Sequence, residues 1–470
     1  MKPLPTLIAG LLALAASLPG LHAADAIPAP AVSAARADKP NVIFILADDL
    51  GVANVSAYGA DNFKTPNVDA LARTGIRLDR CFSAPNCGPS RAMIQTGRYG
   101  FHTGMTGNDK ESQKVIESGG ETMMPKVLKA AGYVTASAGK WSQVPLSPGD
   151  WGFDEYLMIQ GSGKYWNTQD NGDNYTVNGK KVPLLDGEYM PDKMHEFAVD
   201  FITRHKDEPF YLYYPMSHVH NDILRTPDSA PDSKDFYSDN IAYMDKLVGK
   251  LMSELDRLKL RENTVVFFVG DNGVSPGEAE RSTIGGKRLS GHKGTLLEGG
   301  SLVPGIVSWP GKIPPGTTTT SLVDFTDFLP SIAEIARAEI PAGLNLDGKS
   351  LVGHLLGYAA APREWIFVGL GRSWYVRDAR WKLTDKGEFF DMKGAPFIES
   401  PVPAETTDTA AISGRQRLAA VLAELNPSAG KVDHGDGTGK FPAAQKAAKK
   451  EKAKQKKAEA EAKKSAAPVK

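Results

Sequence analysis

The sequence predicts an α/β fold in which helices flank a large, mostly parallel sheet, followed by a small antiparallel subdomain. Apolar runs rich in β-branched residues recur along the chain, and amphipathic stretches of helical period separate them. After about residue 360 this alternation gives way to short aromatic runs broken by turn residues, as in "EWIFVGLGRSWYVRDARWKLTDKGEFFDM". Together these patterns favour one large α/β unit with a smaller unit appended to it.

Three apolar runs predict the central strands. They are "KPNVIFILADDL" at 39–50, "EPFYLYYPMSHVH" at 208–220 and "NTVVFFVGDNG" at 263–273. Their near-continuous apolar character is typical of strands that are buried on both faces of a parallel sheet. The first and third runs end with aspartates, and the second ends with histidines. Because ligands of such sheets bind beyond the carboxyl ends of the strands, these ends are the expected site.

Amphipathic stretches between the strands predict the helices. "TPNVDALARTG" and "ETMMPKVLKAAG" carry Pro near the start and Gly just past the end, as helices prefer. "YSDNIAYMDKLVGKLMSELDRLKL" predicts a long helix before the third strand. Strand and helix alternation of this kind implies parallel strands joined by helical crossovers.

The two ends of the chain differ in composition from the rest. Residues 1–26 combine Lys2, a short apolar stretch and small residues at a possible cleavage point, which predicts a signal peptide and therefore export to the periplasm or medium. We expect 27–38 to be a linker, 39–360 the catalytic domain and 361–427 the small subdomain. The remaining residues, 428–470, form a Lys- and Ala-rich tail with almost nothing apolar to bury.

Composition excludes some classes of partner. The 470 residues have a formal net charge of zero, which gives no argument for nucleic acid binding. The tail from Lys440 onward holds 11 Lys and 3 Glu, and it could either adhere to an anionic surface or remain a solvated tail. After the signal peptide no apolar run is long enough to predict a membrane-spanning helix.

Acidic side chains follow two of the predicted strands. Asp48 and Asp49 end the first, and Asp271 and Asn272 end the third. Carboxylate and amide oxygens suit Ca²⁺ or Mg²⁺ rather than zinc. An Asp pair after a strand is more often a turn and a helix cap, but the matching "GDNG" makes a metal site the better interpretation.

The chain holds two cysteines, Cys81 and Cys87. A disulfide between residues six apart would close a very small loop and stabilise little. At least one thiol therefore needs another explanation. Cys87 stands at the start of a predicted helix, which allows a nucleophile or a precursor of one.

The segment Cys87-Gly88-Pro89-Ser90-Arg91, followed by Thr96-Gly97-Arg98, resembles the signature of the type I sulfatases. The resemblance covers about 39–392 and implies the alkaline-phosphatase-like fold. Further landmarks appear in the order of that family: "NVIFILADDLG", "TPNVDALARTGIRLDRCFSAPNCGPSR", "ETMMPKVLKAAGYVTASAGKW", "WGFDEY", "VVFFVGDNG", "HKGTLLEGGSLVPGIVSWPG" and "YVRDARWKL". In this family a formylglycine-generating enzyme converts the signature cysteine to Cα-formylglycine.

The resemblance implies a mechanism for residue 87. The aldehyde adds water to become a geminal diol, one hydroxyl attacks the sulfur of a bound sulfate ester, and the second then expels sulfate. It also implies that Ca²⁺, in preference to Mg²⁺, is held by Asp48, Asp49, Asp271, Asn272 and position 87. Arg91, one turn further along the helix, would steady the diol.

The resemblance also assigns candidate cations and acids. Lys140 in "AGKW" and Lys293 in "HKGTLLEGG" match the sulfate-binding lysines, where they would neutralise charge on the ester oxygens. Lys287 and His292 lie nearby with weaker claims. Either His218 or His220 in "MSHVHN" fits the general acid that protonates the leaving alcohol. We favour His218, with a pocket or packing role for the other.

One position departs from the family pattern. The lysine motif usually continues as Gly-Lys-Trp-His, but here Ser142 follows Trp141. Serine cannot accept a proton at neutral pH, so turnover would be slower unless another group, such as His102, takes its place. This substitution leaves the predicted metal site and nucleophile intact.

The sequence thus predicts an exported sulfatase acting on a sulfated small molecule or glycan, with carbohydrate or aryl sulfates as the substrate class. Two alternatives remain at this point. A phosphatase or phosphonate hydrolase of the same superfamily would not need the cysteine signature. A non-catalytic protein that binds sulfated glycans would tolerate the loss of the histidine at position 142.

Overall fold

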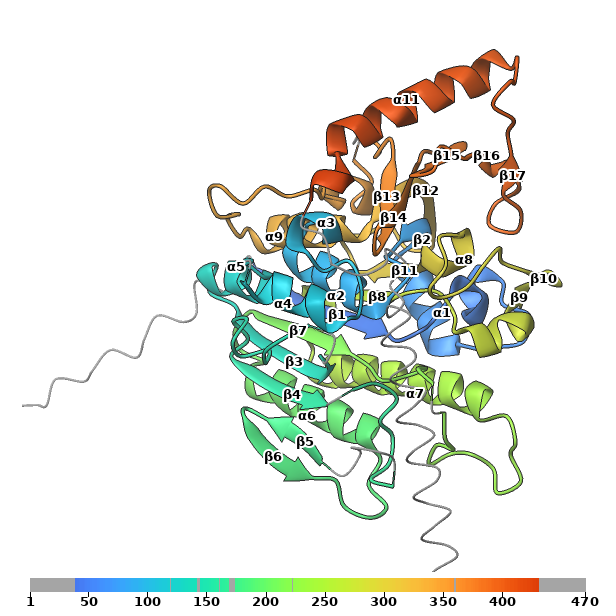
Figure 1. Cartoon of the computed structure of the whole chain (residues 1–470). Coiled ribbons are helices and arrows are strands. Elements are labelled where there is room, and N and C mark those ends of the chain that lie inside the picture. Colours follow the sequence, from blue (N-terminus) through green and yellow to red (C-terminus); the bar gives the residue numbers. More distant parts are fainter. Residues whose placement is uncertain are drawn as a thin grey trace, which may run out of the picture.

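The computed structural model describes residues 39–430 apart from 119, 142–143, 160, 169–173, 222 and 359–360. The expected signal peptide, the linker up to residue 38, Ser142 and the tail beyond Gly430 lie outside the described residues. Within them, a large sheet crosses the molecule, helices cover both of its faces, and a smaller sheet lies against one end (Figure 1).

The large sheet has ten strands and is mixed but mostly parallel. β1 lies at its centre and pairs in parallel with β7 on one side and β8 on the other. In spatial order the strands are β12 (Thr317–Asp324), β2 (Ile76–Phe82), β11 (Leu302–Ser308), β8 (Thr264–Gly270), β1 (Asn41–Ala47), β7 (Phe210–Pro215), β3 (Val134–Lys140), β4 (Glu155–Ile159), β5 (Asn174–Val177) and β6 (Lys180–Pro183). The three strands predicted from the apolar runs are therefore neighbours.

Side chains of β1 alternate between two hydrophobic layers, because successive residues of a strand point to opposite faces. Phe44 and Leu46 join a core cluster that includes residues of α2, α5 and α9. Ile43 and Ile45 join a second cluster with residues of α1, α6 and α7. Helices cover both faces of β1, and this is the physical reason why its sequence is continuously apolar.

The helices predicted from amphipathic stretches are present in the structure as α1, α5 and α7. Within the described residues the helices are α1 (Pro66–Arg73), α2 (Cys87–Thr96), α3 (Gly100–Thr103), α4 (Lys110–Ser118), α5 (Met124–Ala130), α6 (Met190–Arg204), α7 (Phe236–Arg257), α8 (Glu298–Ser301), α9 (Phe328–Ala336), α10 (Val352–Leu355) and α11 (Thr409–Leu425). None of them is long and apolar enough to cross a bilayer.

A five-stranded antiparallel sheet forms the predicted small subdomain. Its strands are β13 (Ile366–Leu370), β14 (Ser373–Arg377), β15 (Trp381–Thr384), β16 (Phe389–Asp391) and β17 (Ser400–Pro401). The helix α11, which the sequence did not reveal, packs on this sheet through Ala411 and Leu418 beside Trp381. A two-stranded hairpin, β9 (Thr283–Ile284) and β10 (Lys287–Arg288), lies elsewhere in the fold.

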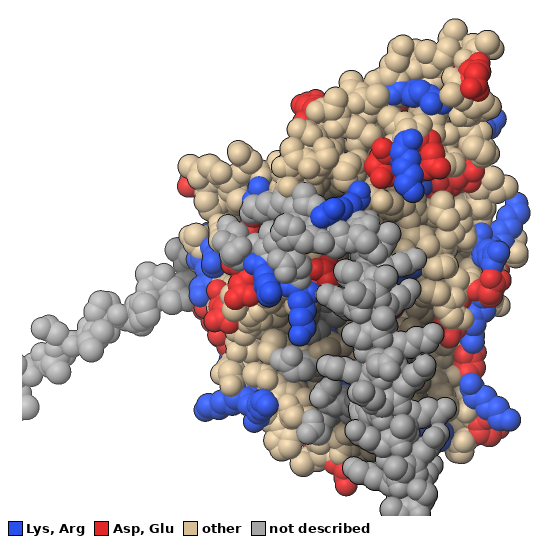
Figure 2. Space-filling view, in the orientation of Figure 1, with Lys and Arg blue, Asp and Glu red and all other residues tan. Residues whose placement is uncertain are grey.

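Charged side chains of both signs are interspersed over the face shown in Figure 2, with no large area of one sign among the described residues in that view. The charges that the sequence places at strand ends behave differently. Asp48, Asp49, Asp271 and Lys140 are all buried, and so is Arg91 in α2. The fold therefore gathers a group of acidic and basic side chains inside the molecule.

Candidate active site

Four neighbouring strands deliver polar side chains to one edge of the large sheet. Asp48 and Asp49 follow β1, and Asp271 follows β8. Lys140 is the last residue of β3, and the two histidines come shortly after β7. The order β8-β1-β7-β3 is parallel throughout, so all four carboxyl ends meet at the same edge. The sequence-predicted acidic and basic residues are thus brought together.

The oxygen-bearing groups after β1 and β8 lie against one another. The backbone N–H of Asp49 donates to Asp271 Oδ1 at 3.0 Å, and Asn272 Nδ2 donates to Asp49 Oδ1 at 2.8 Å. Asp49 has a φ of 58°, in the left-handed region that few residues other than glycine adopt. This turn directs the side chains of Asp48 and Asp49 to a common point.

Cys87 begins α2 and points its thiol at the two aspartates. Cys87 Sγ lies 3.6 Å from Asp48 Oδ1 and 3.9 Å from Asp49 Oδ1, and the thiol is fully buried. Burial, with the charge of Asp271, raises the pKa of the Cys87 thiol to about 12. The other cysteine, Cys81, is also free and lies in β2, so the two form no disulfide.

Arg91 lies one helical turn after Cys87 and joins the same group. Its Nη2 is 2.7 Å from Asp271 Oδ2 and 3.5 Å from Asp48 Oδ1, and its Nη1 donates to the carbonyl of Lys140 at 2.9 Å. A buried guanidinium needs such partners because an unpaired buried charge is strongly unfavourable. Arg91 therefore joins α2 to the ends of β1, β3 and β8.

Two lysines complete the charge balance. Lys140 Nζ lies 2.5 Å from Asp48 Oδ2, and Lys293 Nζ lies 2.6 Å from Asp49 Oδ1. Burial alone would raise the pKa of Asp48, but the positive charges of Lys140, His220 and Arg91 together outweigh it and lower that pKa. Burial would likewise lower the pKa of Lys293, and the surrounding acidic groups raise it instead. Lys293 is therefore held in its cationic form, and both lysines contact the carboxylates that lie beside Cys87.

The two histidines of "MSHVHN" have different surroundings. His220 lies with its Nε2 3.9 Å from Asp49 Oδ2, and 22% of its side chain is exposed. His218 is fully buried, with its Nε2 3.1 Å from the Tyr189 hydroxyl, and burial lowers its pKa to about 3. His218 therefore lies among aromatic neighbours, whereas His220 lies beside the carboxylates of the cluster; the assignment of the general acid to His218 or His220 stays a prediction.

The donor set around Cys87 fits a divalent cation. Ligand atoms of Asp48, Asp49, Cys87 and His220 all lie within 4.8 Å of one another. Among the residues that the structure describes, the buried Asn272 Oδ1 finds no hydrogen-bond partner, which is uncommon for a buried amide oxygen. Carboxylate and amide oxygens are the ligands that hard cations prefer. An ion held here would satisfy Asn272 Oδ1.

The remaining candidates lie in other contacts. His102 Nδ1 is 2.8 Å from Asp347 Oδ2, so it is engaged by a carboxylate outside the cluster around Cys87. Lys287 is exposed on β10, with its Nζ 5.8 Å from the centre of the Phe397 ring. His292 Nδ1 lies 2.9 Å from the carbonyl of Lys293. Of these three residues, only His292 is next to a residue of the site, Lys293.

One residue that touches the first turn of α2 was missed from the sequence. Asn108 accepts a hydrogen bond from the Gly88 N–H at 2.8 Å, next to Cys87. It lies in a loop twenty residues downstream with no periodicity or motif around it. No sequence signal marks it, because the contact depends on tertiary structure.

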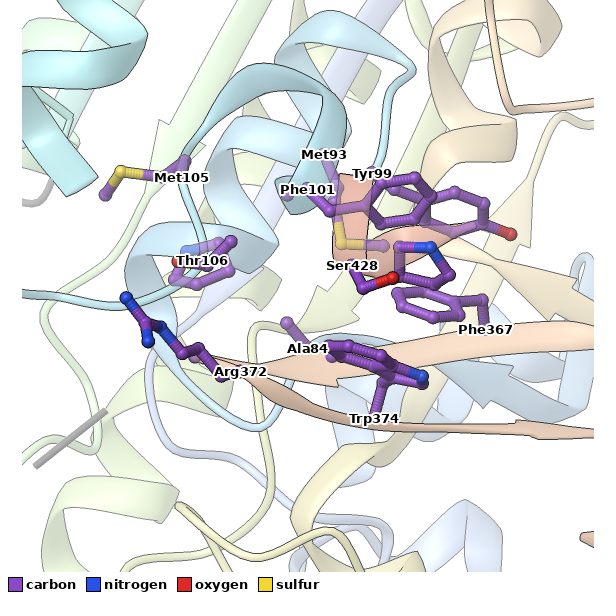
Figure 3. Close-up of a pocket in the computed structure, with 15 residues that line it drawn as sticks. Ala84, Met93, Tyr99, Phe101, Met105, Thr106, Phe367, Arg372, Trp374 and Ser428 are labelled. Carbon is purple, nitrogen blue, oxygen red and sulfur yellow. The ribbon is translucent and has the colours of Figure 1, made fainter. Parts of the chain in front are cut away.

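A cavity of about 520 Å³ lies on the other side of α2 (Figure 3). Pro89 and Met93 form one wall, and these positions point away from Cys87 and Arg91 at helical spacing. Tyr99, Phe101, Phe367 and Trp374 supply its aromatic lining. The cavity is therefore separate from the cluster around Cys87.

Comparison with known proteins places this geometry in a family. Residues 40–338 match the family model described as Sulfatase. Arylsulfatase G of Rattus norvegicus is 33% identical over 383 residues, covering 71% of this chain and 72% of that protein. Arylsulfatase A of Homo sapiens is 33% identical over 372 residues, covering 72% of each.

Solved structures of other proteins share the fold of this chain. The crystal structure of Ps i-CgsB in complex with k-i-k-neocarrahexaose superposes with a TM-score of 0.71 at 26% identity, covering 83% of this chain and 92% of that one. BT4656 in complex with D-glucosamine-2-N,6-O-disulfate shares the fold with a TM-score of 0.69. The chain belongs to the sulfatase family. It has the alkaline-phosphatase-like fold and is a sulfuric ester hydrolase.

Proposed function

We propose that this protein is an exported, formylglycine-dependent sulfatase in which residue 87 carries the nucleophile. The observation that carries the proposal is the position of Cys87 Sγ, 3.6 Å and 3.9 Å from two buried carboxylates at a sheet edge. An aldehyde at this position would be hydrated beside Arg91. The hydrate would supply one hydroxyl for attack on sulfur and a second for release of sulfate.

The cationic side chains support binding of the ester. Lys140 and Lys293 come to the site from different parts of the chain, the end of β3 and the loop before α8. Together they can bind sulfate oxygens and offset the charge that develops on them. Arg91 is held by Asp271 and so keeps its guanidinium near residue 87. These three residues bind and orient the anion.

His220 is proposed to protonate the leaving alcohol. It is partly exposed, unlike His218, and it faces Asp49. A neutral imidazole can also take up a proton on return, as the second half of the reaction requires. The alcohol would then leave without developing a full negative charge on its oxygen.

Asp48, Asp49, Asp271 and Asn272 are proposed to hold Ca²⁺, in preference to Mg²⁺. Asn272 Oδ1 and the three carboxylates supply the oxygen ligands that calcium prefers. When bound, the ion would polarise sulfate oxygens and the hydrated side chain of residue 87.

The substrate class is proposed to be sulfated carbohydrates or aryl sulfates. Two findings support it: the arylsulfatases among the relatives, and the complex of the similar structure, Ps i-CgsB, with k-i-k-neocarrahexaose. The signal peptide expected at 1–26 supports export from the cytoplasm, and polymeric glycan sulfates are accessible to an exported enzyme.

We keep the domain boundaries at 39–360 and 361–427 as proposals. Maturation would need a formylglycine-generating enzyme.

Hydrolysis assays test the proposed function. The full-length protein, co-produced with a formylglycine-generating enzyme, should release sulfate from p-nitrophenyl sulfate or from members of a panel of sulfated oligosaccharides. Cys87→Ala should abolish release while circular dichroism stays unchanged. Binding of sulfated glycans without any release by the wild-type protein would instead identify a non-catalytic binding protein.

A further inference from the structure

The first turn of α2 lacks the usual capping contact. Helices begin with backbone N–H groups that have no partner within the helix, and an N-cap side chain normally accepts from one of them. Here Asn86 occupies the N-cap position, but its side chain makes no such bond, and Pro89 has no N–H. The first intrahelical bond of the turn runs from Ser90 N to the Asn86 carbonyl. The N–H of Gly88 therefore needs a partner from elsewhere.

Asn108 supplies that partner from a distant loop. Its Oδ1 accepts from the buried N–H of Gly88 at 2.8 Å, although Asn108 is an exposed residue. Gly88 directly follows residue 87. The bond thus fixes the peptide plane that leads out of the nucleophile, and rotation of that plane would move the residue 87 side chain relative to Asp48.

The loop that carries Asn108 is held on both sides. The backbone N–H of Gly371, in the turn between β13 and β14, donates to the Thr106 carbonyl at 2.9 Å. Asp109 accepts from Ser112 N at 2.9 Å and from Ser112 Oγ at 2.8 Å, which caps α4. Figure 3 shows Thr106 beside Arg372 of that turn. The small sheet therefore supports the loop that fixes α2.

We infer that Asn108 is a positioning residue for the nucleophile, acting as a remote N-cap of α2 through its hydrogen bond to Gly88. The inference rests on the proposed function of residue 87. It gives the small sheet a part in catalysis, because the contacts from Gly371 to Thr106 and from Asn108 to Gly88 form a continuous path to residue 87.

Three variants separate positioning from simple folding. Asn108→Ala removes the acceptor, whereas Asn108→Asp keeps an acceptor and adds a negative charge one peptide unit from residue 87. Asn62→Ala is the matched control, because Asn62 is also exposed and its Nδ2 donates to the Arg281 carbonyl at 2.7 Å. The formylglycine content of each protein is measured by mass spectrometry, so that kcat is expressed per converted residue.

Steady-state kinetics with p-nitrophenyl sulfate should distinguish Asn108→Ala from Asn108→Asp and from the control. Asn108→Ala should lower kcat about tenfold with KM within about twofold, because loss of one buried hydrogen-bond partner misplaces the nucleophile. Asn108→Asp should keep kcat within about threefold and raise KM, because its carboxylate repels the anionic ester. Asn62→Ala should match the wild type. Unchanged kcat in Asn108→Ala, or equally low kcat in Asn108→Asp, would overturn the inference.

Amide hydrogen exchange gives a reading that does not depend on activity. A peptide spanning 86–93 should exchange faster in Asn108→Ala than in the wild type, and at the wild-type rate in Asn108→Asp and Asn62→Ala. Equal exchange in all four proteins would overturn the inference. If the wild type hydrolyses no sulfate ester, the proposed function fails, whereas the exchange experiment still decides whether Asn108 caps α2.

Discussion

Two histidines separated by one residue follow β7 and have opposite properties. His218 is enclosed by aromatic rings, including Tyr165 and Tyr189, and burial lowers its pKa to about 3, so its ring is neutral near pH 7. His220 stays partly exposed beside Asp49. A strand alternates its side chains between faces, but the turn after β7 does not continue that geometry, so spacing alone could not choose between them.

Replacing His220 tests its role as general acid. His220→Asn should lower kcat about 100-fold on a sulfated sugar and much less on p-nitrophenyl sulfate, because nitrophenolate leaves without a proton. Steady-state kinetics on both substrates measure the difference. His354→Gln, in α10, serves as control and should leave both rates unchanged. Equal losses on the two substrates would contradict the assignment.

The site residues that could be predicted are those embedded in local motifs. Asp48, Cys87 and Lys293 each stand in a recognisable segment, and the structure places all three within one cluster. Asn108 could not be predicted, since its partner Gly88 is distant in sequence and the bond uses a backbone N–H. A side chain that bonds to a backbone N–H produces no recognisable pattern of residue types in the sequence.

At the scale of elements, the close approach of β3 to β7 positions Lys140. Gly139 has a φ of 140°, and a Cβ built on it would lie 2.1 Å from the Pro215 carbonyl oxygen. No side chain fits there, so glycine is required immediately before Lys140. The sequence showed a glycine in "AGKW" but not the backbone that faces it.

Substitution of this glycine should disturb both stability and the site. Gly139→Ala should lower the free energy of unfolding by about 2–3 kcal/mol, because the strands must separate to admit a methyl group. It should also weaken activity through displacement of Lys140. Gly277→Ala is the control: nothing lies within 4 Å of a Cβ at that position, so its unfolding free energy should stay within about 0.5 kcal/mol of wild type. Urea titrations distinguish the two outcomes.

A buried carboxyl at the end of β12 gives the stability a pH dependence. Burial raises the pKa of Asp324 from 3.8 to about 6, although Arg363 opposes the shift. Between these values the folded protein holds a proton that the unfolded chain releases. Asp324 therefore contributes a loss of stability as pH rises from about 4 to 6, and no further loss above that.

The variant Asp324→Asn should lack this component. Its unfolding free energy minus that of the wild type should increase as pH rises through that window and then stay level. Urea unfolding at several pH values measures the difference. A difference that stays constant across the window, or falls with pH, would mean that Asp324 is ionised in the folded state.

Strand existence could be predicted better than strand direction. β1, β7 and β8 were recognisable because their apolar runs are long and β-branched. β11 runs antiparallel to both of its neighbours, which an apolar run does not encode. α11 was missed because few of its residues are buried, so its apolar periodicity is weak.

For the whole molecule, the cluster joins parts of the chain that are far apart in sequence. Residues after β1, β8 and β3, together with α2 and the loop before α8, meet around three carboxylates and three cations. A cation that binds only the folded protein stabilises all of these connections together. Metal binding should therefore raise the free energy of unfolding of the whole protein.

Calcium should raise the melting temperature of the whole protein. Ligand at about 100 times its dissociation constant adds about 2.7 kcal/mol, which corresponds to a rise of a few °C for a chain of this size. Differential scanning fluorimetry with Ca²⁺ and with chelator measures it. Asp271→Ala should abolish the calcium-dependent rise. If this variant responded like the wild type, the ion would be bound elsewhere.

The central claim is that residue 87 is the nucleophile only after its thiol has become an aldehyde. The most direct measurement is the mass of the peptide containing residue 87, taken from a preparation whose sulfate ester hydrolysis has been assayed. We predict loss of hydrogen sulfide and gain of oxygen, with activity proportional to the converted fraction. An unmodified thiol in a fully active preparation would contradict the account.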